Sequence, residues 1–234
     1  MLNDPLFWIL TLPGILIGLY AQAMIKRNYV RYSNVPSAGG LTGAQTARRM
    51  LDANGLQDVA VEVTPGVLSD HYDPRAKVLR LSSDVYHAPT LAAEGIAAHE
   101  TGHALQDADD YAPMELRTWI VPVVALSSKT APWAFIGGFM LDIPVLAWAG
   151  VAMFAASTLF AIITLPVELN ASRRAQELLV GLGLVTTGEQ AAGVRSVLRS
   201  AAWTYVAGAV SALGSLLYFG ALLFSRSRGR GGPA

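Results

Sequence analysis

The sequence predicts a mainly α-helical membrane protein with three or four transmembrane helices and one small α+β segment. Of its 234 residues, 53% are hydrophobic and only 15% are charged, whereas a soluble domain carries about a quarter charged residues. The apolar residues are also collected in long runs without a charge, and a soluble helix would keep a charged stripe. The lipid bilayer is therefore an expected partner of this chain.

Three uncharged runs match the roughly 20 residues that a helix needs to cross a bilayer. A fourth run, residues 119–141, is interrupted by Lys129 and contains two prolines, so it is either a span or a re-entrant or interfacial helix. The first run is not a signal peptide by its pattern, because Asn3 and Asp4 precede it in place of a basic region. The three uncharged runs are residues 6–24, 143–167 and 203–224.

Charge and cysteine content exclude several functions. The chain has 17 basic and 17 acidic residues, and no stripe of positive charge marks a surface for nucleic acid. It also has no cysteine, which excludes disulfides, cysteine nucleophiles and every metal site built on thiolates. Any metal ligands must therefore come from His, Asp or Glu.

The distribution of Lys and Arg predicts the orientation in the membrane. With four spans, eight of these residues flank the spans on one side and three lie on the other, and the side with more positive charge is normally cytoplasmic. We therefore expect a multi-pass protein of the cell membrane whose main polar segment faces the cytoplasm. With only three spans, the Gly/Arg-rich tail at 225–234, which we expect to be disordered, would lie on that side too.

The polar segment after the first span has the pattern of a small α+β unit. Thr42 and Gln45 form a capping box for a short helix that Gly55 ends. Residues 59–64 and 77–82 alternate apolar and polar side chains, which predicts a small antiparallel sheet. A second helix is expected from Thr90 onward, with the sequence LAAEGIAAHETGHALQ.

This second helix carries the motif His99-Glu100-Thr101-Gly102-His103. On a helix the two His residues lie one turn apart on the same face, so both imidazoles can bind one Zn²⁺. Glu100 would then lie beside the metal, where it could take a proton from a zinc-activated water as general base and pass it on as general acid. The motif therefore indicates a zinc hydrolase with Glu100 as its catalytic residue.

A catalytic zinc usually has a third protein ligand, and the sequence leaves several candidates open. Glu168 is favoured because it directly follows the span 143–167, where an acidic residue is costly without a function. A surface salt bridge with a neighbouring arginine is its alternative role. For His71 we favour a turn histidine bonded to carboxylates over a group that stabilises the oxyanion, and His87 is interpreted as structural. The other candidate ligands are Asp107, Asp109, Asp110, His71 and His87.

Four blocks of sequence resemble the YugP-like neutral zinc metallopeptidases of bacteria in order and spacing, across residues 32–179. They are GLTGAQTARRMLDANGL, LSDHYDPRAKVLRLS, VYHAPTLAAEGIAAHETGHALQ and LPVELNASRRAQELL. More distantly, the chain is similar to the HtpX and CAAX-processing gluzincin membrane peptidases. The resemblance implies that His99, His103 and Glu168 bind zinc and that Glu100 is the general acid/base. One departure is Ser172, which stands where the HtpX-type pattern has an Asp.

The expected function is that of a membrane-bound zinc endopeptidase that cleaves a protein or peptide substrate, with no nucleic acid partner. Residues 77–82, if they form an edge strand near the zinc, could pair with an extended substrate. The alternatives are a membrane scaffold or adaptor with a structural zinc site and, last, a transporter. The sequence does not indicate the oligomeric state.

The expected organisation has six parts, which alternate between membrane and polar segments. The parts are an N-terminal transmembrane helix (1–25), a cytoplasmic metallopeptidase segment (26–118), a transmembrane hairpin (119–167), a polar helical segment with the third zinc ligand (168–202), a C-terminal transmembrane helix (203–224) and a basic tail (225–234).

Overall fold

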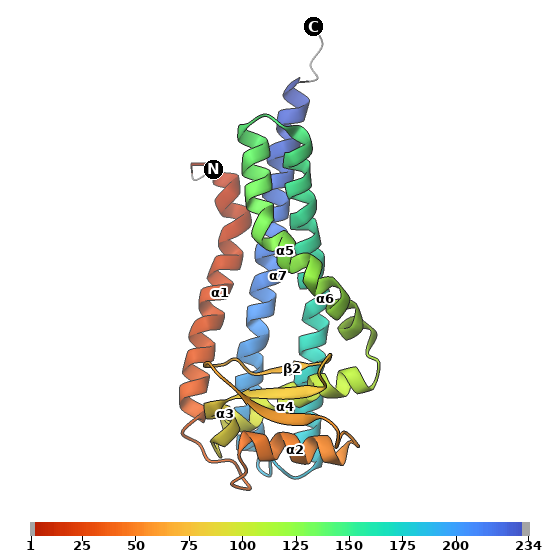
Figure 1. Cartoon of the computed structure of the whole chain (residues 1–234). Coiled ribbons are helices and arrows are strands. Elements are labelled where there is room, and N and C mark those ends of the chain that lie inside the picture. Colours follow the sequence, from red (N-terminus) through yellow and green to blue (C-terminus); the bar gives the residue numbers. More distant parts are fainter. Residues whose placement is uncertain (1–2, 231–234) are drawn as a thin grey trace. The chain divides into compact units, whose positions relative to one another are not determined.

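Four long apolar helices dominate the computed structural model, which describes residues 3–230 (Figure 1). Each is long and apolar enough to cross a membrane, which confirms a mainly α-helical membrane protein with a small α+β segment. The four helices are α1 (Pro5–Tyr32), α5 (Ala112–Met140), α6 (Pro144–Gly181) and α7 (Gly188–Arg230).

Helix α5 contains the fourth run, for which the sequence left a span or an interfacial helix open. It is continuous through Pro122 and Pro132, and membrane helices tolerate proline where neighbouring groups satisfy the freed carbonyls. By length and composition α5 is a candidate span. The structure therefore favours four spans over three.

The C-terminal tail differs from the expectation. Helix α7 continues to Arg230, so residues 225–230 are helical rather than disordered. Arg226 donates a hydrogen bond to the carbonyl oxygen of Phe139 at 2.6 Å and pairs with Asp142 at 3.0 Å. These contacts give the end of the helix partners that composition alone does not reveal. The remaining residues of the predicted tail, 231–234, lie outside the described residues.

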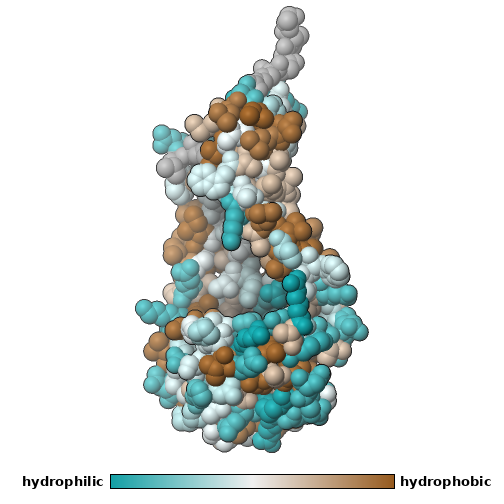
Figure 2. Space-filling view, in the orientation of Figure 1, coloured by the Kyte–Doolittle hydropathy of each residue, from teal (hydrophilic) through white to brown (hydrophobic). Residues whose placement is uncertain are grey.

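The chain divides into two compact units, and all four long helices contribute to both. The helical unit comprises Met1–Tyr20, Leu116–Leu165 and Thr204–Ala234, and the α+β unit comprises Ala21–Glu115 and Pro166–Trp203. Large apolar side chains stay exposed on the helical unit, for example Trp133 at 76% and Val145 at 81%. Figure 2 shows hydrophobic residues gathered along the long helices and hydrophilic residues over the α+β unit. Such exposed apolar surface is what lipid-facing helices present.

Small residues allow the helices of the helical unit to pack closely. A Cβ atom at Gly138 of α5 would lie 2.3 Å from the backbone nitrogen of Ala147 in α6. A Cβ atom at Gly214 of α7 would lie 2.0 Å from the carbonyl oxygen of Leu10 in α1. Both glycines therefore serve contacts within this chain, as small residues at membrane helix interfaces do.

The sheet of the α+β unit has three strands in the order β1-β3-β2. Its strands are β1 (Ala60–Thr64), β2 (His71–Asp73) and β3 (Val78–Ser82). Strands β1 and β3 are parallel, with Ala60 opposite Val78, so the expected antiparallel pairing was wrong. The reason is that β2 lies in the connection between them and is itself the antiparallel neighbour of β3. Strand β3 is therefore central, so the condition for residues 77–82 to pair with an extended substrate, that they form an edge strand, is not met.

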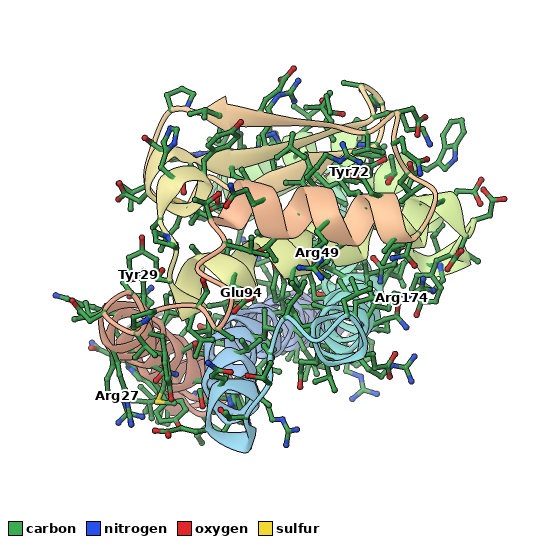
Figure 3. All side chains as sticks on the ribbon, turned by 90° about the horizontal axis from the view of Figure 1, so that it is seen from below. Arg27, Tyr29, Arg49, Tyr72, Glu94 and Arg174 are labelled. Carbon is green, nitrogen blue, oxygen red and sulfur yellow. The ribbon has the colours of Figure 1, made fainter. Side chains whose placement is uncertain are left out.

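Helix α4 (Leu91–Ala108) is the buried centre of the α+β unit. Its N-cap is Thr90, whose hydroxyl accepts a hydrogen bond from the Ala93 N–H. One side of α4 packs with the sheet, α2 (Gly43–Ala53) and the short α3 (Ser83–His87), and another side packs on α6 and α7. Seen from below in Figure 3, α4 lies behind α2, with the ends of α6 and α7 on its other side. The predicted capping box of α2 is present, with both Thr42–Gln45 hydrogen bonds formed.

Candidate metal centre

The two histidines of the motif lie on one face of α4. They are four residues apart, which is about one helical turn, and their ring centroids are 4.8 Å apart. The face they occupy is turned toward α6. A Cβ atom at Gly102 would lie 2.5 Å from the carbonyl oxygen of Ala171 in α6, so the two backbones approach as closely as they do only because residue 102 has no side chain.

This close approach brings Glu168 of α6 to both histidines. Its Oε2 lies 3.2 Å from Nε2 of His99 and 3.5 Å from Nε2 of His103. Glu168 and His103 are buried, and the side chain of His99 is 13% exposed. Within residues 3–230, these three side chains form the one cluster of three or more His, Asp or Glu residues whose ligand atoms lie within 4.8 Å of each other.

The geometry of this cluster fits zinc. Tetrahedral zinc with bonds of about 2.0 to 2.1 Å holds neighbouring ligand atoms about 3.3 Å apart, and the two histidine nitrogens lie 3.2 and 3.5 Å from Glu168 Oε2. Two imidazoles and one carboxylate are also a ligand set typical of catalytic zinc. The residues present could therefore hold Zn²⁺ with one position left for water or substrate.

Gln106 fixes the ring of His103 from behind. Its Oε1 lies 2.9 Å from Nδ1 of His103, while its Nε2 donates to the Val167 carbonyl at 2.8 Å and to Oδ1 of Asn170 at 2.9 Å. Because both partners of the Gln106 amide nitrogen are acceptors, the Gln106 amide has one orientation, and its oxygen faces the His103 ring. Nδ1–H of His103 therefore donates to this oxygen, and Nε2 is the ring nitrogen that faces Glu168 and would bind a metal.

Ser172 has the same role for His99. Its Oγ lies 3.1 Å from Nδ1 of His99, so the hydroxyl can accept a hydrogen bond from Nδ1–H, with Nε2 as the nitrogen that would bind a metal. Ser172 is four residues after Glu168, which places both on the same face of α6. The hydroxyl thus occupies the place of the Asp that the HtpX-type pattern has at this spacing.

Glu100 is held beside the cluster by the sheet. The backbone N–H of Tyr72 in β2 donates to Oε2 of Glu100 at 3.0 Å, and the glutamate is only 8% exposed. Burial raises the pKa of the Glu100 carboxyl to about 7, although the nearby His99 acts to lower it. A carboxyl group in this environment is suited to both accepting and donating a proton near neutral pH.

The other candidate ligands lie outside the cluster. Asp109 pairs with Arg174, and Oδ2 of Asp107 accepts hydrogen bonds from the hydroxyl of Tyr72 and from Lys77. Asp110 is likewise not part of the three-residue group. The two arginines near Glu168 in sequence have other acidic partners, Glu177 for Arg173 and Asp109 for Arg174.

The two remaining histidines also lie elsewhere. His71 is exposed in β2, and its Nδ1 is 2.8 Å from the Ser69 carbonyl oxygen, so its partner is backbone and not a neighbouring carboxylate as expected. His87 ends α3 and packs edge-on against the ring of Tyr86, with ring centroids 4.8 Å apart.

Fold and site together define a membrane protein with a His-His-Glu centre of the kind that binds catalytic zinc. Residues 7–224 match the family model described as "Putative neutral zinc metallopeptidase", and the chain belongs to this family. It is 46% identical over 214 residues to the "Putative membrane protease YugP" of Bacillus subtilis (strain 168), an alignment that covers 92% of this chain and 95% of that protein. No solved structure matches the chain.

Proposed function

We propose that this chain is a zinc-dependent endopeptidase of the gluzincin type that cleaves peptide bonds at the membrane surface. In this proposal His99, His103 and Glu168 bind the metal, and Glu100 is the general acid/base. The observation that carries it is the convergence of the three ligand atoms within 4.8 Å, with a buried carboxyl group on the residue after His99.

The roles of the chain's own residues follow from their contacts. Zinc, when bound, would polarise a peptide carbonyl and make water acidic enough to lose a proton near neutral pH. Glu100 would accept that proton and deliver it to the departing amide nitrogen. Its hydrogen bond from Tyr72 N–H fixes one carboxylate oxygen and leaves the other for the proton. Gln106 and Ser172 would keep the two imidazoles in the tautomer that binds metal.

Membrane insertion would place this chemistry close to the bilayer. Glu168 directly follows the apolar run 143–167 in the same continuous helix. The excess of Lys and Arg around the polar segments favours the cytoplasmic side for the site. We therefore propose substrates that are proteins or peptides presented at the cytoplasmic surface of the cell membrane.

The proposal is tested by replacing the general base while keeping its shape. Glu100→Gln should lower the rate of casein cleavage by the purified, detergent-solubilised protein by about 10²- to 10⁴-fold, the usual contribution of general acid–base catalysis. Zinc content should stay at the wild-type level, because the ligands are unchanged. Glu115→Gln is the matched control, since Glu115 is exposed on α5 and should leave cleavage unchanged.

The alternative of a scaffold with a structural zinc site makes the opposite prediction. A structural site needs no general base, so the glutamine variant would keep full cellular function. Cleavage by Glu100→Gln at the wild-type rate, with zinc bound, would contradict the proposed role of this residue.

A further inference from the structure

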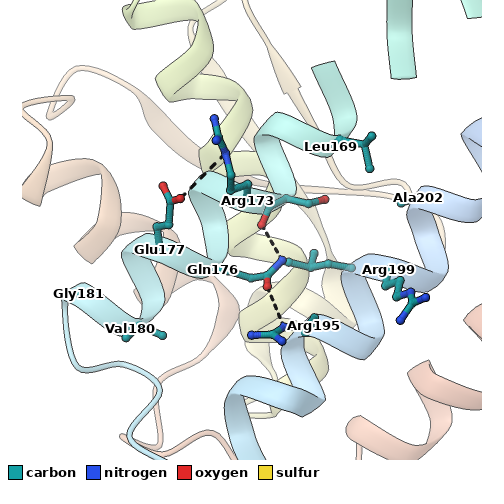
Figure 4. Close-up of a pocket in the computed structure, with 11 residues that line it drawn as sticks. Leu169, Arg173, Gln176, Glu177, Val180, Gly181, Arg195, Arg199 and Ala202 are labelled. Atoms are coloured by element: carbon teal, nitrogen blue, oxygen red, sulfur yellow. Dashed lines mark hydrogen bonds and ion pairs between the residues drawn. The ribbon is translucent and has the colours of Figure 1, made fainter. Parts of the chain in front are cut away.

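A groove with a volume of about 740 Å³ lies between α6 and α7. Of the residues that line it, only Ser172 also contacts the candidate metal centre. All residues that line the groove belong to the α+β unit. Its walls combine apolar side chains with three arginines (Figure 4). The apolar residues include Leu169, Leu198 and Ala202, and the arginines are Arg173, Arg195 and Arg199.

The groove has a surplus of positive charge. Glu177 is its one acidic side chain, and Arg173 pairs with it at 4.0 Å. Arg195 is exposed, and its Nε donates to the neutral Oε1 of Gln176 at 3.3 Å. Arg199 is exposed and has no hydrogen bond or ion pair with any residue of the described part of the chain. Two guanidinium groups are thus available for an anion.

On the α7 wall of the groove, Arg199 and then Arg195 follow Ala202 with increasing distance from the apolar run 203–224. Leu169 and Ala202 lie at the same end of the groove (Figure 4), within two residues of the apolar runs 143–167 and 203–224 of their helices. Arg199 comes three residues before Ala202 in α7, about 5 Å further from the apolar run along the helix axis. Arg195 lies one turn further still. An apolar end next to the membrane-spanning runs with two cations beyond it matches a phospholipid, whose acyl chains lie in the bilayer and whose phosphate lies at the membrane boundary.

We propose that this groove binds an anionic phospholipid, with its phosphate at Arg195 and Arg199 and the upper part of its acyl chain against Leu169 and Ala202. Charge complementarity selects an anionic headgroup over a zwitterionic one, and the adjoining apolar runs select a lipid over a soluble anion. Ser172 lines the same groove and contacts His99, so the bound lipid would lie against the helical turn that positions the metal centre. The proposal needs membrane insertion but neither zinc nor peptide cleavage.

The test is lipid binding by the full chain, measured by native mass spectrometry in detergent. Phosphatidylglycerol should bind with higher affinity than phosphatidylcholine of the same acyl chains. A basic residue near the membrane surface contributes about fivefold to the binding of an anionic lipid, so Arg195→Ala/Arg199→Ala should lower phosphatidylglycerol affinity by more than tenfold. Phosphatidylcholine binding should be unchanged. Arg49→Ala is the matched control, because Arg49 is an exposed arginine on α2 that does not line the groove.

A second variant keeps the test informative if the alanine protein folds poorly. Arg195→Lys/Arg199→Lys retains both charges and should keep most of the preference for phosphatidylglycerol. Equal affinity of the wild type for both lipids, or an undiminished preference in a folded alanine variant, would overturn the proposal. So would displacement of the lipid by millimolar inorganic phosphate, which would indicate a site for free anions. If the alanine variant kept its lipid binding and instead had a higher KM for acidic peptides, the groove would be assigned to substrate binding.

Discussion

Gln106 and Ser172 hold the two imidazole rings of the candidate metal centre from behind. Each bonds to Nδ1 of one histidine, and Gln106 is itself fixed by Val167 and Asn170 of α6. Partners of this kind set the tautomer and the ring orientation of a ligand histidine, and zinc affinity depends on both.

Gln106→Ala should therefore weaken zinc binding although it removes no ligand. The expected loss is about 10- to 100-fold in affinity, as is usual when such a partner is deleted. Competition with a chelator of known affinity measures it. Gln57→Ala, on an exposed side chain before β1, is the control. If the alanine variant at Gln106 retained wild-type affinity, the role assigned to this amide would be wrong.

Some residues of this centre can be identified from the sequence, and others cannot. His99 and His103 follow from their spacing on a helix, and Glu168 was favoured because it stands at the end of a span. Ser172 has a detectable signal, since its spacing of four residues places it on the face of Glu168. Tyr72 contributes a backbone N–H to Glu100, and a backbone group leaves no signature in the sequence.

The crossing of α4 and α6 at Gly102 sets the distance between the histidines and Glu168. The space at this glycine is limited by backbone atoms of Ala171, which cannot move aside as a side chain can. A Cβ atom at Gly95, in the same helix α4, would have the side chain of Val194 as its nearest neighbour at 3.5 Å, which is an ordinary contact distance.

The two glycines should therefore respond oppositely to alanine. Gly102→Ala should push the helices apart, which lowers the melting temperature and reduces zinc content together. Gly95→Ala should be neutral or slightly stabilising, because alanine favours a helix over glycine by about 1 kcal/mol. Thermal unfolding and metal analysis of both purified proteins provide the comparison. If the two variants had the same melting temperature and zinc content, the close approach at Gly102 would not be required for stability or for zinc binding.

Elements with strong local signals were predicted well, and their pairing was not. Uncharged runs of about 20 residues and the capping box at Thr42 depend on neighbours in the sequence, and both were confirmed. The parallel pairing of β1 with β3 depends instead on β2, a three-residue strand inside their connection. A strand this short has too few residues for an alternating pattern, so the sequence indicated a simple antiparallel pair.

At the scale of the whole molecule, the number of spans decides on which side of the membrane the C-terminal end lies. Four candidate spans place it opposite the polar segment that contains α2 to α4, whereas three would place both on one side. The chain has no cysteine, so labelling of a single introduced cysteine shows on which side of the membrane it lies, without background from native thiols.

Ser83→Cys and Ser227→Cys are a matched pair for this measurement. Both serines are exposed, the first in α3 and the second near the end of α7, and cysteine has nearly the same shape. In intact cells a membrane-impermeant maleimide should label position 227 and leave position 83 unlabelled until the membrane is opened. Equal protection of both positions would contradict the four-span arrangement.

The central claim is that one zinc ion is held jointly by α4 and α6. Its most direct test is the zinc content of the purified protein in the wild type, Glu168→Gln and Asp109→Asn, each substitution exchanging a carboxylate for an amide. We expect about one zinc per chain in the wild type and in Asp109→Asn, and a loss of most of the metal in Glu168→Gln. Full zinc content without the Glu168 carboxylate, or no zinc in the wild type, would contradict the assignment of this centre.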